Sequence, residues 1–236
     1  YSILSEAAGD IASPQLRNMG TVGGNLCQRP RCEYYRETFD CLRKGGDICY
    51  AYDGHNKLHC IVGGGPCYIV HPSDLAVAFL ALDAEVAIHS QNNPRTVPIN
   101  EFYILPEDDY TKETILEPDE FVKEIIIKDL PEGTRSGYFK FMERAVWDFA
   151  VVSLGLVLEP NGNSIKKGSA AFGGVAPKPW LEKNVTDMLN NFTPNEENIQ
   201  ELAKQAFTDA DPLEHNEYKI PLSRNILIKM MKRLTG

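Results

Sequence analysis

All six cysteines of this 236-residue chain fall within one window of 41 residues. Cysteines that serve only as small core side chains would be scattered along the chain, so the clustering indicates a local chemical role. The candidates are a metal site, an iron–sulfur cluster and a loop stapled by disulfides. The six residues are Cys27, Cys32, Cys41, Cys49, Cys60 and Cys67.

The spacing of the cysteines narrows these candidates without choosing among them. No two cysteines form a C-x2-C pair, which argues against a zinc ribbon and against the usual ferredoxin runs. Four widely spaced thiolates on a long loop can still enclose a cubane cluster. The window carries six basic residues against five carboxylates in a chain of net charge −9, and nearby cationic donors stabilise an anionic cluster. An iron–sulfur cluster, a zinc site and three disulfides all remain open from the spacing.

Local sequence separates the six cysteines into two groups. Cys60 lies in the apolar run 58–62, which predicts a buried strand and a core thiol. Cys27 directly follows a glycine-rich turn and is also interpreted as structural. The remaining four are the candidate metal ligands: Cys32, Cys41, Cys49 and Cys67.

Composition sets broad bounds on function. With 43% hydrophobic and 24% charged residues, the chain is typical of a globular protein with one large domain or two small ones. Its net charge of −9 argues against a nucleic-acid partner. No apolar run approaches the roughly 18 residues that a membrane-spanning helix needs. Because the chain begins with Tyr1, we expect it to be processed or to be part of a longer polypeptide.

The pattern of apolar residues predicts an α+β fold with a joint at residues 130–133. Periodicity indicates a first helix that ends near Ser13 and Pro14, whereas residues 19–26 are glycine-punctuated and predict a turn. Residues 160–163 predict a hairpin turn. The other expected helices are 73–83, 180–191, 195–208 and 219–235, and the expected strands are 85–89, 121–127, 136–144, 151–158 and 164–173.

Three further features are candidates for ligand binding. Residues 21–25, T-V-G-G-N, present consecutive amides beside small side chains, which can bind phosphate oxygens. Asp74 is expected to cap a helix or to accept hydrogen bonds from sugar hydroxyls. Lys140 lies on a predicted strand, where a lysine is ordinarily a solvated surface residue.

Four segments together resemble one protein family. They are S-P-Q-L-R-N-M-G-T-V-G-G-N-L (13–26), Q-R-P-R-C (28–32), C-L-R-K-G-G (41–46) and H-P-S-D-L-A-V-A-F-L-A-L-D-A (71–84). They resemble the FAD-binding medium subunit of molybdenum hydroxylases, the xanthine dehydrogenase and aldehyde oxidoreductase group. The branch with an extra [4Fe–4S] loop is the most similar, and the segment 139–153 extends the resemblance into the second half.

The resemblance implies a fold and its boundaries. Residues 1–130 would form the second part of a two-subdomain FAD-binding fold of the vanillyl-alcohol-oxidase type, with the iron–sulfur loop inserted at 27–67. Residues 131–236 would form a three-stranded antiparallel sheet with helices, like the C-terminal domain of CO dehydrogenase flavoprotein. The family's first FAD subdomain, with a second glycine-rich loop, has no counterpart in this sequence.

The resemblance also implies which residues bind cofactors. The FAD pyrophosphate would be held at residues 21–25, and Asp74 would bind sugar or ribityl hydroxyls. The [4Fe–4S] cluster would be bound by Cys32, Cys41, Cys49 and Cys67. The full set of expected FAD-binding residues is Thr21, Gly23, Gly24, Asn25, Gln28, Asp74, Val122 and Lys140.

By the same resemblance, the chain is an oxidoreductase subunit without a catalytic acid or base of its own. It would relay electrons from a large molybdenum-cofactor subunit and a small [2Fe–2S] subunit to an external acceptor. The alternatives are the flavin subunit of a 4-hydroxybenzoyl-CoA reductase-like enzyme and a non-redox module with a zinc- or disulfide-stabilised loop. The family allows a cytoplasmic location or export with a signal-bearing partner.

Overall fold

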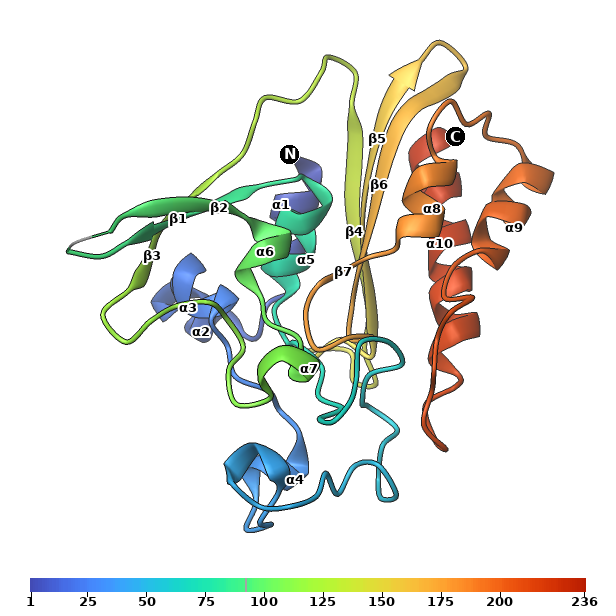
Figure 1. Cartoon of the computed structure of the whole chain (residues 1–236). Helices are drawn as coiled ribbons and strands as arrows, with labels where there is room; N and C mark the ends of the chain where they lie inside the picture. The colour runs from blue at the N-terminus through green and yellow to red at the C-terminus, as the bar shows by residue number, and fades with distance from the viewer. Residues whose placement is uncertain (92) are drawn as a thin grey trace.

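The computed structural model describes residues 1–91 and 93–236, and its largest sheet forms in the second half of the chain (Figure 1). The strands β4 (Arg135–Phe141), β5 (Val152–Asn161) and β6 (Ser164–Gly173) are antiparallel neighbours. They lie close to the ranges predicted from the sequence. In the described part of the chain this sheet has a fourth strand, β7 (Trp180–Leu181), where three were predicted. At two residues long, β7 carries too little pattern to be recognised from sequence.

Helices cover both faces of this sheet (Figure 1). The helices α1 (Ser2–Gly9) and α5 (Asp74–Ala81) pack on one face, and α8 (Lys183–Met188) and α10 (Lys219–Thr235) pack on the other. The helix α9 (Glu196–Lys204) packs against α10. Because both faces are covered, most of β5 is an unbroken buried run rather than an alternating one.

A smaller antiparallel sheet lies to one side of α5, with strand order β2-β1-β3. Its strands are β1 (Glu85–His89), β2 (Arg95–Pro98) and β3 (Phe121–Ile126). Two short helices, α6 (Ile99–Phe102) and α7 (Pro106–Asp109), lie between β2 and β3. Both sheets are antiparallel, which confirms the α+β prediction. None of the described helices is long and apolar enough to cross a lipid bilayer.

The turn predicted for residues 19–26 is wrong, because most of this segment is the helix α3 (Val22–Leu26). The Thr21 hydroxyl accepts a hydrogen bond from the Gly24 backbone N–H at 3.0 Å and caps the helix. Leu26 is completely buried in the core beside α5. The cap and this burial offset the low helix propensity of the two glycines. The first predicted helix ends earlier than expected, at Gly9, and a separate short helix, α2 (Pro14–Met19), follows it.

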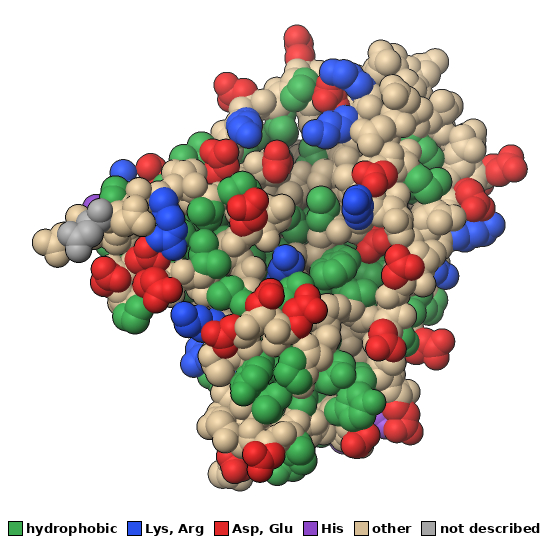
Figure 2. Space-filling model, viewed as in Figure 1, with side chains coloured by type: hydrophobic (Ala, Val, Ile, Leu, Met, Phe, Trp, Pro, Cys, Tyr) green, Lys and Arg blue, Asp and Glu red, His purple; other side chains and the backbone are tan. Residues whose placement is uncertain are grey.

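The cysteine window, residues 27–67, has little regular structure. It contains only the helix α4 (Glu33–Arg36) and the 3-10 turn η1 (Leu42–Lys44) among its described residues. The strand predicted over 58–62 does not form, because the backbone N–H groups of Ile61 and Val62 both point to the carbonyl of Val175. Figure 2 shows apolar side chains gathered on the lower part of the face, where Figure 1 places α4 and the window.

Candidate functional site

A cavity of about 740 Å³ opens where α1, α2, α3 and the loop after β4 meet. This volume is in the range of sites for sizeable organic ligands. Six of the eight expected FAD-binding residues line it, although they are up to 119 positions apart in the sequence. They are Thr21, Gly24, Asn25, Gln28, Asp74 and Lys140.

The other two expected residues, Gly23 and Val122, pack against each other instead. A Cβ atom added to Gly23 would lie 3.3 Å from Cβ of Val122, which is tighter than an ordinary contact. Gly23 therefore lets α3 approach the strand β3 closely. Neither residue is among those that line the cavity in the described part of the chain.

Asp74 and Lys140 form a buried ion pair at the floor of the cavity. Lys140 Nζ lies 2.8 Å from Asp74 Oδ2, and the Tyr138 hydroxyl donates to Asp74 Oδ1 at 2.6 Å. Burial raises the pKa of Asp74, although Lys140 and Tyr138 act in the opposite direction. The sequence suggested a solvated Lys140, but its side chain is almost wholly buried. Both Asp74 oxygens already have protein donors, so the pair is a fixed dipole beside the cavity.

Sequence reasoning missed several residues of this cavity. Trp147 and Phe149, in the loop between β4 and β5, line it together with the cationic side chains of Arg17 and Arg31. Trp147 is 63% exposed and has a φ of +54°, which a bulky residue rarely adopts. Loop positions like these carry no periodic pattern, so only the folded chain brings them to the cavity.

The four candidate ligand cysteines converge on one small cavity inside the window. Cys32, Cys41, Cys49 and Cys67 all line it, around a space of about 10 Å³. Its wall also contains Arg43 and aromatic side chains. Apart from the tyrosine hydroxyls, the polar groups are therefore four thiols, one imidazole (His59) and one guanidinium, a set that suits an anionic iron–sulfur cluster.

The thiols in this cavity interact with one another. A hydrogen bond with Cys67 lowers the pKa of Cys49 to about 6 and raises the pKa of Cys67. Burial raises the pKa of Cys32 to about 11. All six cysteines are free in the structure. Among residues 1–91 and 93–236, no three His, Cys, Asp or Glu side chains are close enough to bind a single metal ion.

A [4Fe–4S] cluster takes four protein ligands. The ligands of a [4Fe–4S] cluster bind four different iron atoms, so their sulfurs lie farther apart than the ligands of one ion. The four thiols that line this cavity equal that number of ligands.

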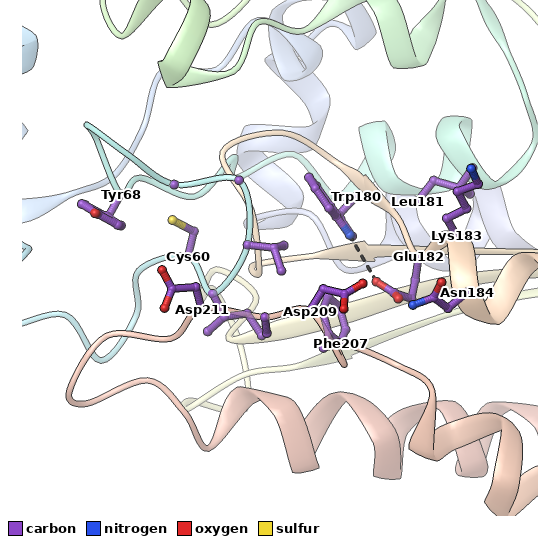
Figure 3. A pocket seen from close by; sticks show the side chains of 15 residues that line it. Cys60, Tyr68, Trp180, Leu181, Glu182, Lys183, Asn184, Phe207, Asp209 and Asp211 are labelled. Carbon is purple, nitrogen blue, oxygen red and sulfur yellow. Dashed lines mark hydrogen bonds between the residues drawn. The ribbon is translucent and has the colours of Figure 1, made fainter.

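Cys60 and Cys27 lie away from this cavity. Cys60 is 1% exposed, which confirms the predicted buried thiol, and burial raises its pKa to about 12. It lines a different cavity, of about 440 Å³, with Trp180 and Glu182 on the opposite wall (Figure 3). Cys27 is half-buried and packs against the apolar core around α5 and β1.

Two sets of polar contacts fix the window to the rest of the molecule. The Arg43 guanidinium, whose side chain is 1% exposed, donates to the Tyr110 carbonyl and to the Glu113 carboxylate. Arg29 also pairs with Glu113, at 3.1 Å. On the other side, Lys219 at the start of α10 donates to the carbonyls of Leu58 and His59, both at 2.9 Å. These anchors are 67 to 161 residues apart in sequence and carry no local signal.

The fold and the two cavities define a mixed α/β subunit with a large ligand cavity beside a four-cysteine loop. Comparison with protein families identifies relatives of both halves of the chain. Residues 1–128 match the FAD binding domain in molybdopterin dehydrogenase, and residues 137–234 match the CO dehydrogenase flavoprotein C-terminal domain.

Individual relatives agree with these matches. The aldehyde oxidoreductase FAD-binding subunit PaoB of Escherichia coli K12 is 34% identical over 98% of this chain and 70% of that protein. The carbon monoxide dehydrogenase medium chain of Hydrogenophaga pseudoflava is 26% identical over 90% of this chain and 58% of that protein. This chain belongs to the family of FAD-binding medium subunits of molybdenum hydroxylases.

Solved structures agree on the fold. The carbon monoxide dehydrogenase of Hydrogenophaga pseudoflava superposes with a TM-score of 0.69 at 23% identity, covering 96% of this chain and 64% of the solved chain. The Cu,Mo-CO dehydrogenase superposes with a TM-score of 0.70 at 20% identity, covering 98% and 66%. The chain thus spans 58 to 70% of the length of these relatives and solved chains.

Proposed function

We propose that this chain is an electron-transfer subunit that binds FAD and one [4Fe–4S] cluster. In the complete enzyme it relays electrons from a molybdenum-cofactor large subunit and a [2Fe–2S] small subunit to an external acceptor, in an aldehyde oxidoreductase or xanthine dehydrogenase type of assembly. Residues 1–130 form the FAD-binding part with the cluster loop at 27–67, and residues 131–236 form the C-terminal part.

The cluster proposal rests on the way in which the fold groups four of the six cysteines around one cavity. The four ligands expected from sequence share one cavity, and the two excluded cysteines lie outside it. A loop built only from core thiols would have no reason to gather these four. In the proposed site Cys32, Cys41, Cys49 and Cys67 each bind one iron atom, and Arg43 offsets part of the negative charge.

The flavin proposal is supported by the large cavity at α3. The Gly24 N–H donates to the Thr21 hydroxyl and the Asn25 N–H donates to the Thr21 carbonyl. The first-turn amides of Thr21 and Val22, which line the cavity, are therefore those that can present N–H groups to a pyrophosphate. Gln28 lies beside them. The Asp74–Lys140 pair sits at the cavity floor, where it can orient a polar group of the ligand. Flavin supplies one- and two-electron redox chemistry, and the chain contributes binding and position.

A third cavity shares lining residues with both proposed sites, which supports placing the flavin and the cluster near each other. It has a volume of about 760 Å³ and shares Arg31, Asp148 and Phe149 with the flavin cavity. It also reaches Cys32, one of the proposed ligands. The Arg31 guanidinium lies 5.1 Å from the centre of the Phe149 ring, and both side chains line the flavin cavity and the third cavity.

The deciding experiment compares Cys41→Ser with Cys60→Ser in the complete, anaerobically purified assembly. We expect the wild type to contain iron and flavin and to show a broad absorption near roughly 400 nm that dithionite bleaches. The Cys41→Ser variant loses iron, because a ligand is removed, and Cys60→Ser retains it. Equal iron loss in both variants contradicts the ligand assignment. A colourless protein with one zinc per chain contradicts the cluster.

A further inference from the structure

The imidazole of His59 lies against one of the proposed ligand sulfurs. His59 Nε2 is 3.3 Å from Cys32 Sγ, well within hydrogen-bonding distance for sulfur. His59 is 7% exposed and lines the four-cysteine cavity. The Tyr34 ring, 6.2 Å away between centroids, packs beside it. No role is expected for His59 from the sequence, because it lies in the apolar run 58–62, which predicts a buried strand.

The other ring nitrogen shows which way the hydrogen bond runs. His59 Nδ1 is buried and has no hydrogen-bond partner among the residues that the structure describes. A neutral imidazole carries one N–H. If that proton were on Nδ1, a buried donor would lack an acceptor and a lone pair would face the sulfur. With the proton on Nε2, the ring donates to Cys32 Sγ, and the imidazolium donates there as well.

The backbone of His59 is held from the far end of the chain. Its carbonyl accepts hydrogen bonds from Lys219 Nζ at 2.9 Å and from Asn216 Nδ2 at 3.2 Å. Lys219 is fully buried and also donates to the Gly174 carbonyl at 2.6 Å. The His59 N–H donates to the Asn56 carbonyl at 2.9 Å. The imidazole is therefore presented to Cys32 by a backbone that has little freedom to move.

We infer that His59 donates a hydrogen bond through Nε2 to the sulfur of Cys32 and thereby raises the reduction potential of the cluster that we propose for this loop. The inference rests on the proposed function. A donor at a ligand sulfur stabilises the more negative, reduced state. In this role His59 is a positioning residue that tunes the cluster and is not itself an iron ligand.

The test measures the midpoint potential of the cluster in the complete assembly by an anaerobic redox titration followed by EPR. His59→Phe keeps a ring but removes the donor, so we expect the reduction equilibrium constant to fall about tenfold. That change corresponds to about 59 mV for a one-electron couple. The matched control is His55→Phe, which makes the same substitution at an exposed site four residues away and leaves the potential unchanged.

Two further variants distinguish the donor from mere packing. In His59→Gln the side-chain amide reaches the position of Nε2, whereas in His59→Asn it reaches only the position of Nδ1. We expect the glutamine variant to retain a potential near that of the wild type and the asparagine variant to resemble His59→Phe. If both amide variants have the same potential, the inference is overturned, and this comparison holds even if His59→Phe folds poorly.

Other outcomes separate this inference from the proposed function. Wild-type protein without iron refutes the cluster itself. Wild-type protein with iron, and a His59→Phe variant with full iron and an unchanged potential, refutes only the role of His59. Loss of iron from both His59→Phe and His59→Gln, as in Cys41→Ser, would make His59 a ligand and would also overturn the inference.

Discussion

The sheet β4-β5-β6 and the cysteine window differ in what holds their backbones in place. In the sheet, continuous antiparallel ladders satisfy the backbone, and apolar side chains such as Leu156 and Phe172 are completely buried between two layers of helices. In the window, side chains from distant segments bind the backbone at a few points, including Arg43 and Lys219.

This difference separates two tasks in one molecule. A hydrogen-bonded ladder with a buried core holds a surface rigidly, and many residues each contribute part of its stability. A loop held by single polar anchors can place sulfur atoms where no regular element would put them, but each anchor then matters individually. The comparison predicts that substitutions in the sheet change the global stability of the chain, whereas substitutions at the anchors change mainly the local stability of the window.

The largest expected effect is in the sheet core. Phe172 is fully buried and packs edge-to-face on Phe207 with ring centroids 4.9 Å apart. Phe172→Ala should lower the free energy of unfolding by about 3–5 kcal/mol, because it leaves a cavity. Phe39→Ala removes a ring that is 41% exposed in the window and should cost far less. Urea denaturation followed by circular dichroism measures both, and equal costs would erase the distinction between the two regions.

A smaller effect should appear at acid pH through His71, which joins the window to α5. Burial lowers the pKa of His71 to about 4. Between pH 4 and about 6.5 the unfolded chain binds a proton that the folded chain does not, so stability rises with pH across this range and is lost as pH falls. From pH 7 to pH 5 this group should cost roughly 2 kcal/mol.

His71→Phe keeps the ring against Tyr103, which lies 4.6 Å away between centroids, and removes the titration. Urea midpoints of the variant and the wild type at pH 7 and pH 5 give the comparison. The variant should lose less stability on acidification than the wild type. An identical pH dependence in the two proteins would show that His71 is not buried in its neutral form.

The smallest expected effect on global stability belongs to the anchor Asn216. Its side-chain amide donates to the carbonyls of His59 and Cys60, at 3.2 and 3.0 Å. Asn216→Ala leaves the Cys60 carbonyl without this donor, while Lys219 still serves His59. We expect a cost of about 1 kcal/mol, the lower end for a buried group that loses its partner.

The informative measurement for Asn216→Ala is limited proteolysis. The variant should be cut faster within residues 27–67, while the core of the sheet stays resistant. Phe172→Ala serves as the opposite control, because it should expose both regions together. If Asn216→Ala were to open the whole chain at once, the window would not be an independently anchored unit.

Sequence alone determined much of this protein. The pattern of apolar residues located the strands β4, β5 and β6 and the helix α10, because burial against a layered core requires apolar side chains at these positions. Spacing and apolar context separated Cys60 from the four cysteines that share a cavity. Short motifs such as T-V-G-G-N were enough for the family resemblance, although α3 itself was missed.

The tertiary structure decided the surroundings of the two sites. His59 meets Cys32 across 27 positions, Arg43 meets Glu113 across 70, and Lys219 holds His59 across 160. A hydrogen bond between distant residues leaves no period in the sequence, and its donor and acceptor types are common everywhere in the chain. Such contacts exist only after the apolar core has brought the segments together, so they can be found only in the folded molecule.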